Sequence, residues 1–185
     1  YPHITKLEKR KIALSDNSLP MDFFNMNNSE TALEAFMHLR LAVDRGLISF
    51  SQCSLYEDLF FCVDSPNDIP RFTYVIFDPQ KSNMVIAQCV IVFSHWISED
   101  TRKWHIGWCV DESFRNKGLG LDIATKALAQ FSTFKQVQGD YIEASVDQGN
   151  IASLKISEKL IGSEEILFNE ETGLTVHSFL KFIGE

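Results

Sequence analysis

The sequence lacks several features that define common protein classes. No apolar run approaches the 18 residues of a membrane-spanning helix, and the N-terminal residues lack the apolar centre of a secretory signal. Positively charged residues are also fewer than negatively charged ones: the sequence has 17 Lys and Arg and 25 Asp and Glu, for a net charge of −8. Nucleic-acid-binding proteins usually carry a basic face. We therefore expect no membrane association and no nucleic-acid partner.

Cysteine is scarce, and no two cysteines have the C-x-x-C spacing of zinc knuckles and thioredoxin-like sites. The four cysteines are Cys53, Cys62, Cys89 and Cys109. Cys89 and Cys109 lie in apolar, strand-like runs, where a free thiol behaves as a small hydrophobic side chain. Disulfides belong mainly to oxidising compartments. We expect free thiols, no bound metal and a cytoplasmic location.

What is present is the composition of an ordinary globular domain. The chain has 185 residues, of which 45% are hydrophobic and 23% are charged. This length and balance predict a single domain over residues 1–185. The 15 Phe predict a core in which aromatic packing is prominent.

The first part of the chain predicts a helix between two less regular stretches. Ile4–Leu14 is a candidate strand, and Thr31 and Glu34 have the spacing of a capping box at the start of a helix. Gly46 is the predicted helix stop. From Ser49 to Pro70 the pattern favours a short helix and a loop that shapes a substrate cleft. The predicted apolar face of the first helix comprises Leu33, Phe36, Met37, Leu39, Ala42 and Val43.

From Phe72 onward, strands predominate. The predicted strands cover Phe72–Phe77, Met84–Phe93, Lys103–Val110, Tyr141–Val146, Glu165–Phe168 and Thr175–Phe182. Helices are expected from Leu121 to Phe131 and from Asn150 to Leu160. This order of elements indicates an α/β fold of the mixed α+β type, with a mostly antiparallel central sheet.

The segment Arg115–Gly120 (RNKGLG) joins a predicted strand to a predicted helix. Its two glycines, Gly118 and Gly120, let the backbone approach a ligand closely and present successive N–H groups. The helix N-terminus adds unpaired donors and the positive end of its dipole. Such a junction binds phosphate without a basic side chain. A glycine-rich turn that only connects the two elements is the simpler alternative.

Two other phosphate-binding motifs do not fit this segment. A Walker loop requires G-x-x-x-x-G-K-[ST], whereas Gly120 is followed by Leu121 and Asp122. A dinucleotide fingerprint requires a third Gly, at the position of Ile123, near the start of a βαβ series. What does fit is R-x-x-G-x-G at a strand–helix junction.

A second junction of the same kind follows the predicted strand Tyr141–Val146, where Asn150 opens the helix NIASLKISEKL. RNKGLG and NIASLKISEKL together resemble the two cofactor motifs of the GNAT superfamily of N-acetyltransferases. The phrase HIGWCVDESFRNKGLG most resembles the branch that acetylates ribosomal-protein N-termini and related small amines. The resemblance is strong over residues 103–161 and extends by element order to the rest. A plain helix N-cap is the alternative role for Asn150, and the two roles are compatible.

The resemblance implies a GNAT-like acyl-CoA N-acyltransferase fold, with helices on both faces of a sheet that is splayed in the middle. It assigns a cofactor-binding core to about 103–162 and acceptor-side helices and a loop to about 29–70. Acetyl-CoA, a co-substrate, would enter the gap between the strands Lys103–Val110 and Tyr141–Val146. The implied cofactor-binding residues are Trp108, Cys109 and Val110 on the strand, Arg115, Asn116, Lys117, Gly118, Leu119, Gly120 and Leu121 on the loop, and Asn150 and Ser153 on the second helix.

The catalytic residues follow the family pattern less closely. Many members carry a Tyr, seven residues after the Asn, as general acid; here that position is Ser157, a weak acid that would need water or another donor. His105 is the first candidate base, because it stands where the ribosomal branch often has Glu and its ordinary pKa near 6.5 suits proton acceptance. A structural His packed beside Trp104 is the alternative. Glu112 and Asp111 are further candidates, unless they only begin a solvated loop.

We therefore predict an N-acetyltransferase that transfers an acetyl group from acetyl-CoA to a primary amine by direct attack in a ternary complex. The amine is a small molecule, a protein N-terminus or a Lys. A backbone N–H near Cys109 or Val110 would polarise the thioester carbonyl. The alternative, motivated by Ser157, is an acyl-CoA-binding sensor or regulatory module with little turnover. The negative charge disfavours a tRNA-acetylating relative, and we expect a monomer or homodimer.

Overall fold

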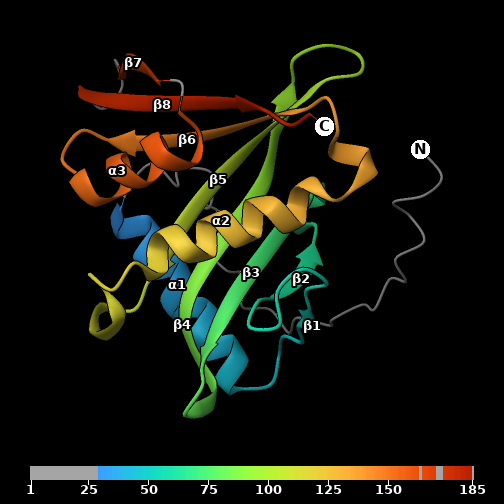
Figure 1. Cartoon of the computed structure of the whole chain (residues 1–185), viewed down its shortest axis with the longest axis vertical. Helices are drawn as coiled ribbons and strands as arrows, with labels where there is room; N and C mark the ends of the chain where they lie inside the picture. Colours follow the sequence, from blue (N-terminus) through green and yellow to red (C-terminus); the bar gives the residue numbers. More distant parts are fainter. Residues whose placement is uncertain (1–28, 163, 170–172, 185) are drawn as a thin grey trace.

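The computed structural model of the chain describes residues 29–162, 164–169 and 173–184. These residues form one eight-stranded sheet in the order β1-β2-β3-β4-β5-β6-β8-β7, with helices on both faces (Figure 1). The strands are β1 (Ser51–Gln52), β2 (Phe60–Asp64), β3 (Arg71–Asp78), β4 (Lys81–Trp96), β5 (Arg102–Val110), β6 (Tyr141–Asp147), β7 (Glu164–Asn169) and β8 (Leu174–Phe182). The predicted mixed α/β fold is confirmed, while the predicted strand Ile4–Leu14 lies outside the described residues.

Helices and short 3₁₀ turns connect the strands. The α-helices are α1 (Ser29–Asp44), α2 (Leu119–Ser132) and α3 (Ile151–Leu160), and the 3₁₀ turns are η3 (Pro66–Asp68), η4 (Glu112–Phe114) and η5 (Lys135–Val137). Among the described residues, no helix is both long and apolar enough to cross a membrane. The predictions for α2 and α3 are confirmed to within a few residues.

Helix α1 agrees with its predicted end but not with its predicted start. Gly46 has a left-handed φ of 66° and donates its N–H to the carbonyl of Val43 at 2.9 Å, which closes the last turn. The helix already begins at Ser29, two residues before the predicted cap Thr31. The capping prediction for Thr31 is therefore wrong, because Thr31 lies within the first turn.

The predicted apolar face of α1 is only partly correct. Phe36 is fully buried, whereas Leu33 and Met37 are 41% and 53% exposed. The 3.6-residue helical repeat aligns Phe36 with Leu39 and Val43, and these three residues pack on the sheet. Leu33 and Met37 are rotated away from that line, so their apolar side chains face outward.

The short helix predicted within Ser49–Pro70 is present only as a single 3₁₀ turn. This stretch forms the short strands β1 and β2 and then the single turn η3. Strand β2 pairs antiparallel with β3, from Phe60 opposite Val75 to Asp64 opposite Arg71. A short continuous apolar run such as Phe60–Val63 has no period, so the sequence could not distinguish strand from helix there. The region 29–70, predicted to be the acceptor side, thus holds one α-helix, the edge strand β1 and its neighbour β2.

Strands β5 and β6 are parallel, and they diverge along their length. Among the described residues their pairing stops at His105 opposite Glu143, although both strands continue beyond it. At the paired end, the carboxylate of Asp140 accepts hydrogen bonds from the Arg102 backbone N–H and from Trp104 Nε1, each at 2.9 Å. The two strands are therefore fastened at one end and open at the other, which confirms the splayed sheet.

Different helices cover the two faces of the sheet (Figure 1). Phe131 of α2 packs with Tyr74 in the main core, whereas Phe36 of α1 packs with Val75 and Val85 in a smaller cluster. Successive strand residues point to opposite faces. Each residue of β5 consequently faces either the α2 side, which is core, or the α1 side.

Candidate active site

The loop between β5 and α2 needs its two glycines for different reasons. Gly118 precedes α2 with φ 80° and ψ −4°, a left-handed conformation that a β-carbon disfavours, and a β-carbon built there would meet nothing within 4 Å. Gly120 has no such φ, but a β-carbon there would lie 3.1 Å from Cδ1 of Ile156 and 3.6 Å from Cγ2 of Val110. Gly118 shapes the turn, and Gly120 lets α2, α3 and β5 meet closely.

The start of α2 presents backbone donors. Asp122 donates its N–H to the carbonyl of Gly118 at 3.0 Å, and this is the first bond of the helix. The N–H groups of the preceding residues, Leu119–Leu121, have no acceptor within the helix, and the positive end of the helix dipole lies at the same place. An anion is therefore favoured at this end of α2.

Basic side chains in the same loop bind the loop itself. Arg115 Nε donates to the carbonyl of Val110, and Lys117 Nζ donates to the carbonyl of Ser113, each at 3.1 Å. Asn116 adopts a left-handed φ of 61°, which Asn tolerates better than most residues. These contacts hold the loop in shape, so its capacity for phosphate resides mainly in backbone groups.

Helix α3 packs against the start of α2. Asn150 Oδ1 accepts the N–H of Ser153 at 3.2 Å, which confirms Asn150 as an N-cap. Ile156, in the middle of α3, is the residue of α3 that a β-carbon at Gly120 would meet. The middle of α3 thus packs against the start of α2, the other helix whose N-terminus the sequence singled out.

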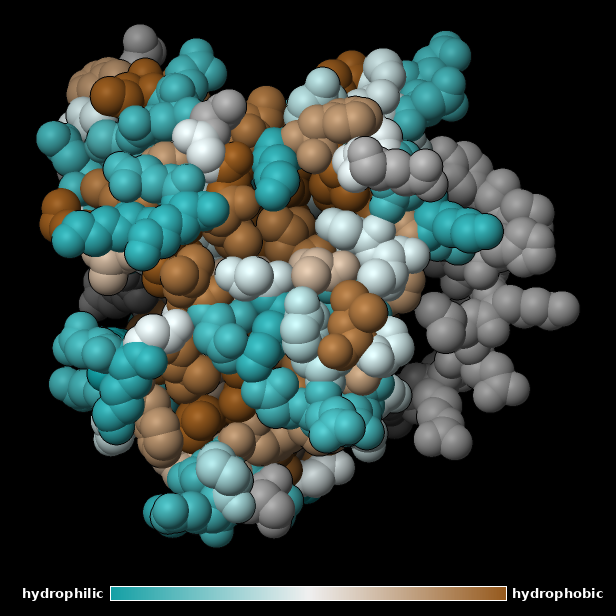
Figure 2. Space-filling view, in the orientation of Figure 1, coloured by the Kyte–Doolittle hydropathy of each residue, from teal (hydrophilic) through white to brown (hydrophobic). Residues whose placement is uncertain are grey.

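The end of β5 offers an unpaired strand edge. Trp108, Cys109 and Val110 pair with β4 on one side, and among the described residues none of them pairs with β6 on the other. Over β5, between α2 and α3, the surface is hydrophobic (Figure 2). Burial raises the pKa of the Cys109 thiol, which keeps it protonated. This edge suits an extended ligand that carries its own hydrogen-bonding groups.

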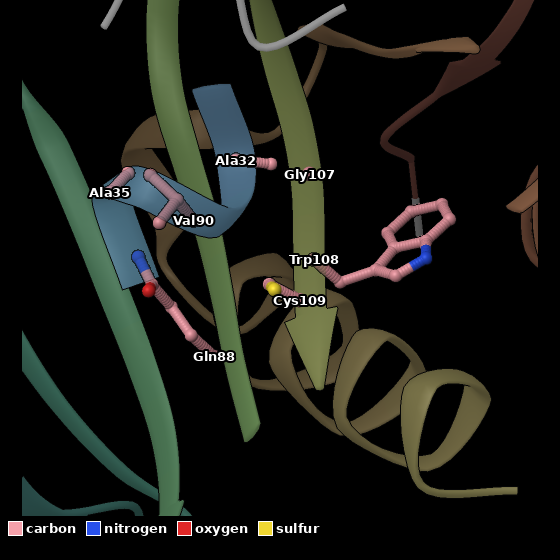
Figure 3. Close-up of a pocket in the computed structure, with 7 residues that line it drawn as sticks. All are labelled: Ala32, Ala35, Gln88, Val90, Gly107, Trp108 and Cys109. Carbon is pink, nitrogen blue, oxygen red and sulfur yellow. The ribbon is translucent and has the colours of Figure 1, made fainter. Parts of the chain in front are cut away.

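A small pocket lies on the opposite, α1 side of β4 and β5 (Figure 3). The Gln88 side chain is directed toward α1, while the Trp108 ring points away from β4. Gln88 is only 6% exposed, and its Oε1 has no hydrogen-bond partner among the described residues. The pocket therefore offers one unpaired acceptor among mostly apolar walls. It is lined by Ala32, Ala35, Gln88, Val90, Gly107, Trp108 and Cys109.

His105 lies at the closed end of the splay, on the α1 side. Its neighbours Trp104 and Ile106 are buried in the main core, so strand alternation directs His105 to the other face rather than beside Trp104. Its side chain is 35% exposed, and Nδ1 lies 3.3 Å from Oε2 of Glu143. Burial lowers the pKa of His105 below its ordinary value; Glu143 opposes this effect, while Lys103 and a second histidine on β4 add to it.

The other predicted catalytic residues come from other elements. Ser157 on α3 is fully buried, and its hydroxyl has no partner among the described residues. Glu112 is exposed in η4. Asp111 accepts the N–H of Ser113 at 2.9 Å and forms an ion pair with Arg40 of α1. Asp111 therefore ties α1 to the start of the loop.

Three residues of this region were missed by the sequence predictions. Glu143 and Gln88 are polar residues inside apolar strands, a pattern that by itself could have marked them, because such residues are rarely buried without a partner or a role. Arg40 gave no such signal, since a basic residue on a helix is usually solvated. Its partner lies 71 positions away in the chain.

Comparison with protein families matches most of the chain. The sequence profile of the acetyltransferase (GNAT) domain matches residues 23–161, which are 139 of the 185 residues of the chain. The matched range includes α1, the sheet through β6, the loop with both glycines and all of α3. Comparison with curated protein sequences finds no match.

Several solved structures are similar at low identity. A chimera of the spermidine N-acetyltransferase SpeG from Vibrio cholerae is 17% identical, with a TM-score of 0.48, over 61% of this chain and 67% of that one. RimL, a ribosomal L7/L12 alpha-N-protein acetyltransferase in complex with coenzyme A, is 15% identical, with a TM-score of 0.48, over 60% and 62%. The ribosomal-protein-S5-alanine acetyltransferase from Vibrio fischeri is 16% identical, with a TM-score of 0.47, over 60% and 61%. By the family match over three quarters of its length, the chain belongs to the GNAT acetyltransferase domain family, a family of acyltransferases.

Proposed function

We propose that this protein transfers an acetyl group from acetyl-CoA to a primary amine by direct attack in a ternary complex. The main support for this proposal is the divergence of β5 from β6. The start of α2, with its unpaired backbone N–H groups, lies where the two strands are apart. From His105 to Val110 the strand provides about 16 Å of backbone. A long, flexible thioester with a polyphosphate at one end fits such a slot.

In this proposal the cofactor is held mainly by backbone. The unpaired edge of Trp108, Cys109 and Val110 extends the sheet onto the pantetheine arm, as an added strand would. The amides of Lys117–Leu121 bind the pyrophosphate at the start of α2. Asn150 and Ser153 bind from α3, where the Asn150 carboxamide oxygen caps the helix and its NH₂ can donate to a ligand. The free thiols of all four cysteines accord with the proposed cytoplasmic location.

The amine approaches from the α1 side, where His105 lies. With its pKa below the ordinary value, His105 is neutral at pH 7 and can take the proton of the attacking amine, directly or through water. A backbone N–H near Cys109 or Val110 polarises the thioester carbonyl. Ser157 donates a hydrogen bond to the departing sulfur. Glu112 is retained as the second candidate base, because it is exposed at the mouth of the loop.

A second candidate function is an acyl-CoA-binding module with little turnover. The observation that favours it is the complete burial of Ser157. A hydroxyl inside the core does not face an open site, so it is poorly placed to protonate the departing thiolate. A serine hydroxyl is also a weak acid at neutral pH. Such a module would need the loop, the splayed strands and Asn150, but not His105.

Calorimetric titration with acetyl-CoA, followed by assays of CoA release, tests both functions. The assay would offer three acceptors: an aliphatic polyamine, a peptide with a free N-terminus, and an N-blocked peptide with one Lys. We expect saturable binding and CoA release that depends on one class of amine. Failure to bind acetyl-CoA would refute both functions. Binding without turnover on any amine would replace the first function by the second.

A further inference from the structure

A buried carboxylate on β6 lies against the candidate base. Glu143 is 8% exposed, although it sits in a strand of otherwise mostly apolar residues. Its Oε1 accepts the hydroxyl of Ser178 at 2.6 Å, and its Oε2 accepts Nζ of Lys103 at 2.9 Å. The same Oε2 lies 3.3 Å from Nδ1 of His105. Both carboxylate oxygens are thus engaged, and the imidazole contacts one of them.

We propose that Glu143 is a positioning residue that fixes the tautomer and orientation of the His105 imidazole, so that Nε2 carries the lone pair that accepts the amine proton. This inference rests on the proposed acetyltransferase function. A neutral imidazole has one N–H and one acceptor nitrogen, and a carboxylate can only accept. An Nδ1–H that points at Glu143 leaves Nε2 as the basic atom.

The contacts around Glu143 keep its carboxylate in this role. Ser178 lies on β8 and Lys103 on β5, so donors on the two strands that flank β6 hold the two oxygens in place. Burial alone would raise the pKa of Glu143, but the hydrogen bonds from Ser178 and Lys103 outweigh it and lower that pKa. The carboxylate therefore stays ionised at neutral pH. It also opposes His105 at the last paired position of β5 and β6, so the backbone register sets their separation.

The charges that face His105 come from three strands: Glu143 on β6, Lys103 on β5 and His95 on β4. Burial, Lys103 and His95 disfavour the imidazolium, so His105 is neutral before the reaction. Glu143 favours the imidazolium. Its negative charge offsets the positive charge that appears on the ring when the proton arrives, without itself taking the proton. The carboxylate thus orients the imidazole and stabilises its charge, and the histidine alone acts as the base.

The proton balance of the step is closed. The amine nitrogen forms a bond to the acetyl carbonyl carbon, and the carbon–sulfur bond breaks, so CoA leaves as a thiolate. The proton lost by the amine nitrogen goes to Nε2 of His105. The imidazolium then returns a proton to the thiolate or to solvent. No oxidant, reductant or metal is required.

Nitrogen NMR of the histidine rings in the free, full-length protein tests the pair without turnover. In the wild type we expect neutral His105 to be the Nδ1–H tautomer. In Glu143→Gln we expect the tautomer population to shift toward Nε2–H and the pKa of His105 to fall by about one unit. Glu143→Asp should restore part of the wild-type signature. A wild-type His105 in the Nε2–H form, or a tautomer and pKa that Glu143→Gln leaves unchanged, would overturn the inference.

The chain offers a matched control, a second histidine–carboxylate pair on the opposite side of β6 from the splay. His177 Nδ1 lies 2.5 Å from Oε1 of Glu164, between β8 and β7. Glu164→Gln should change the His177 signals and leave kcat and the His105 signals unchanged. Loss of the His105 signature in Glu164→Gln would show that any carboxylate loss disturbs the fold, and would overturn a specific role for Glu143.

Kinetics then separate this inference from the proposed function. Glu143→Gln should lower kcat by about 10- to 1,000-fold with the acetyl-CoA Kd unchanged, and it should have no further effect in a His105→Ala background. An additive loss in the double variant would overturn the pairing. If the wild type turns over no amine while the NMR signature of the pair is present, the proposed function fails and the His105–Glu143 pair stands. If the wild type turns over an amine and the signature is missing, the inference fails alone.

Discussion

The two ends of the splay between β5 and β6 differ in the groups that they present: backbone groups at the open end and side chains at the closed end. At the open end the proposed binding groups are backbone N–H groups at the start of α2, and the nearby Arg115 and Lys117 side chains donate to carbonyls of their own loop. At the closed end the groups are side chains, His105 and Glu143, from two strands that meet only in the folded sheet.

This difference has consequences for substitution. A backbone site tolerates changes of most side chains, and it fails only where a new β-carbon alters the backbone path or the packing. A side-chain site fails when one functional group is removed, even if the backbone does not move. The cofactor end should therefore be sensitive at its glycines, and the acceptor end at His105.

The largest effect is expected for His105→Ala. Removal of a general base typically costs 10²- to 10⁴-fold in kcat, while the acetyl-CoA Kd should not change because the backbone site is intact. With a weakly basic amine as acceptor, wild-type kcat/KM should be flat above about pH 6.5. It should fall as the pH drops through the lowered pKa of His105, because the imidazolium cannot accept a proton. Steady-state kinetics measure kcat and its pH dependence, and calorimetry measures the acetyl-CoA Kd. A weakened Kd with unchanged kcat would assign His105 to the cofactor end instead.

Gly120→Ala should have the next largest effect. Its β-carbon would lie 3.1 Å from Ile156 Cδ1, so we expect a loss of about 1–3 kcal/mol in the free energy of unfolding, together with weaker acetyl-CoA binding. Ile156→Val removes that Cδ1 and should recover most of both losses in the double variant. Denaturant unfolding and calorimetry would show this. Absence of any rescue would mean that contact with Ile156 is not the reason for a glycine at this position.

Gly118→Ala should cost about 1 kcal/mol of stability, because alanine disfavours the left-handed φ of 80° although no atom obstructs its β-carbon. Gly139→Ala is the matched control, since Gly139 also has a left-handed φ, of 89°, and no atom within 4 Å of a β-carbon. The two variants should lose similar stability in denaturant unfolding. Only Gly118→Ala should weaken acetyl-CoA binding. Equal binding losses would argue against a cofactor role for the loop.

The smallest effect is expected for Ser157→Ala. The Ser157 hydroxyl is fully buried and has no partner among the described residues, so its removal should leave the free energy of unfolding unchanged or raise it by up to about 1 kcal/mol. A serine hydroxyl is a weak acid, so kcat should fall by less than about tenfold. Thermal unfolding and steady-state kinetics provide the measurement. A fall of 100-fold or more with unchanged stability would make Ser157 the principal acid.

Where the sequence predicted the fold well, the signals were local. The strands from Phe72 onward and the helices α2 and α3 each follow from a period within about ten residues. The failures lie where tertiary contacts decide. The apolar run at Phe60–Val63 forms strand β2 because β3 pairs with it, and Met37 remains exposed because Phe36 lies on the line that faces the sheet.

The sequence by itself determined the proposed cofactor end of this protein. Its features each depend on residues a few positions apart, so a local sequence pattern predicts them. They are the left-handed turn at Gly118, the free donors at the start of α2 and the Asn150 cap. Only the tertiary structure decided the proposed acceptor end. His105 meets Glu143 because the buried Asp140 carboxylate and the core packing fix the register of two parallel strands. No local pattern encodes the register between strands that are distant in sequence.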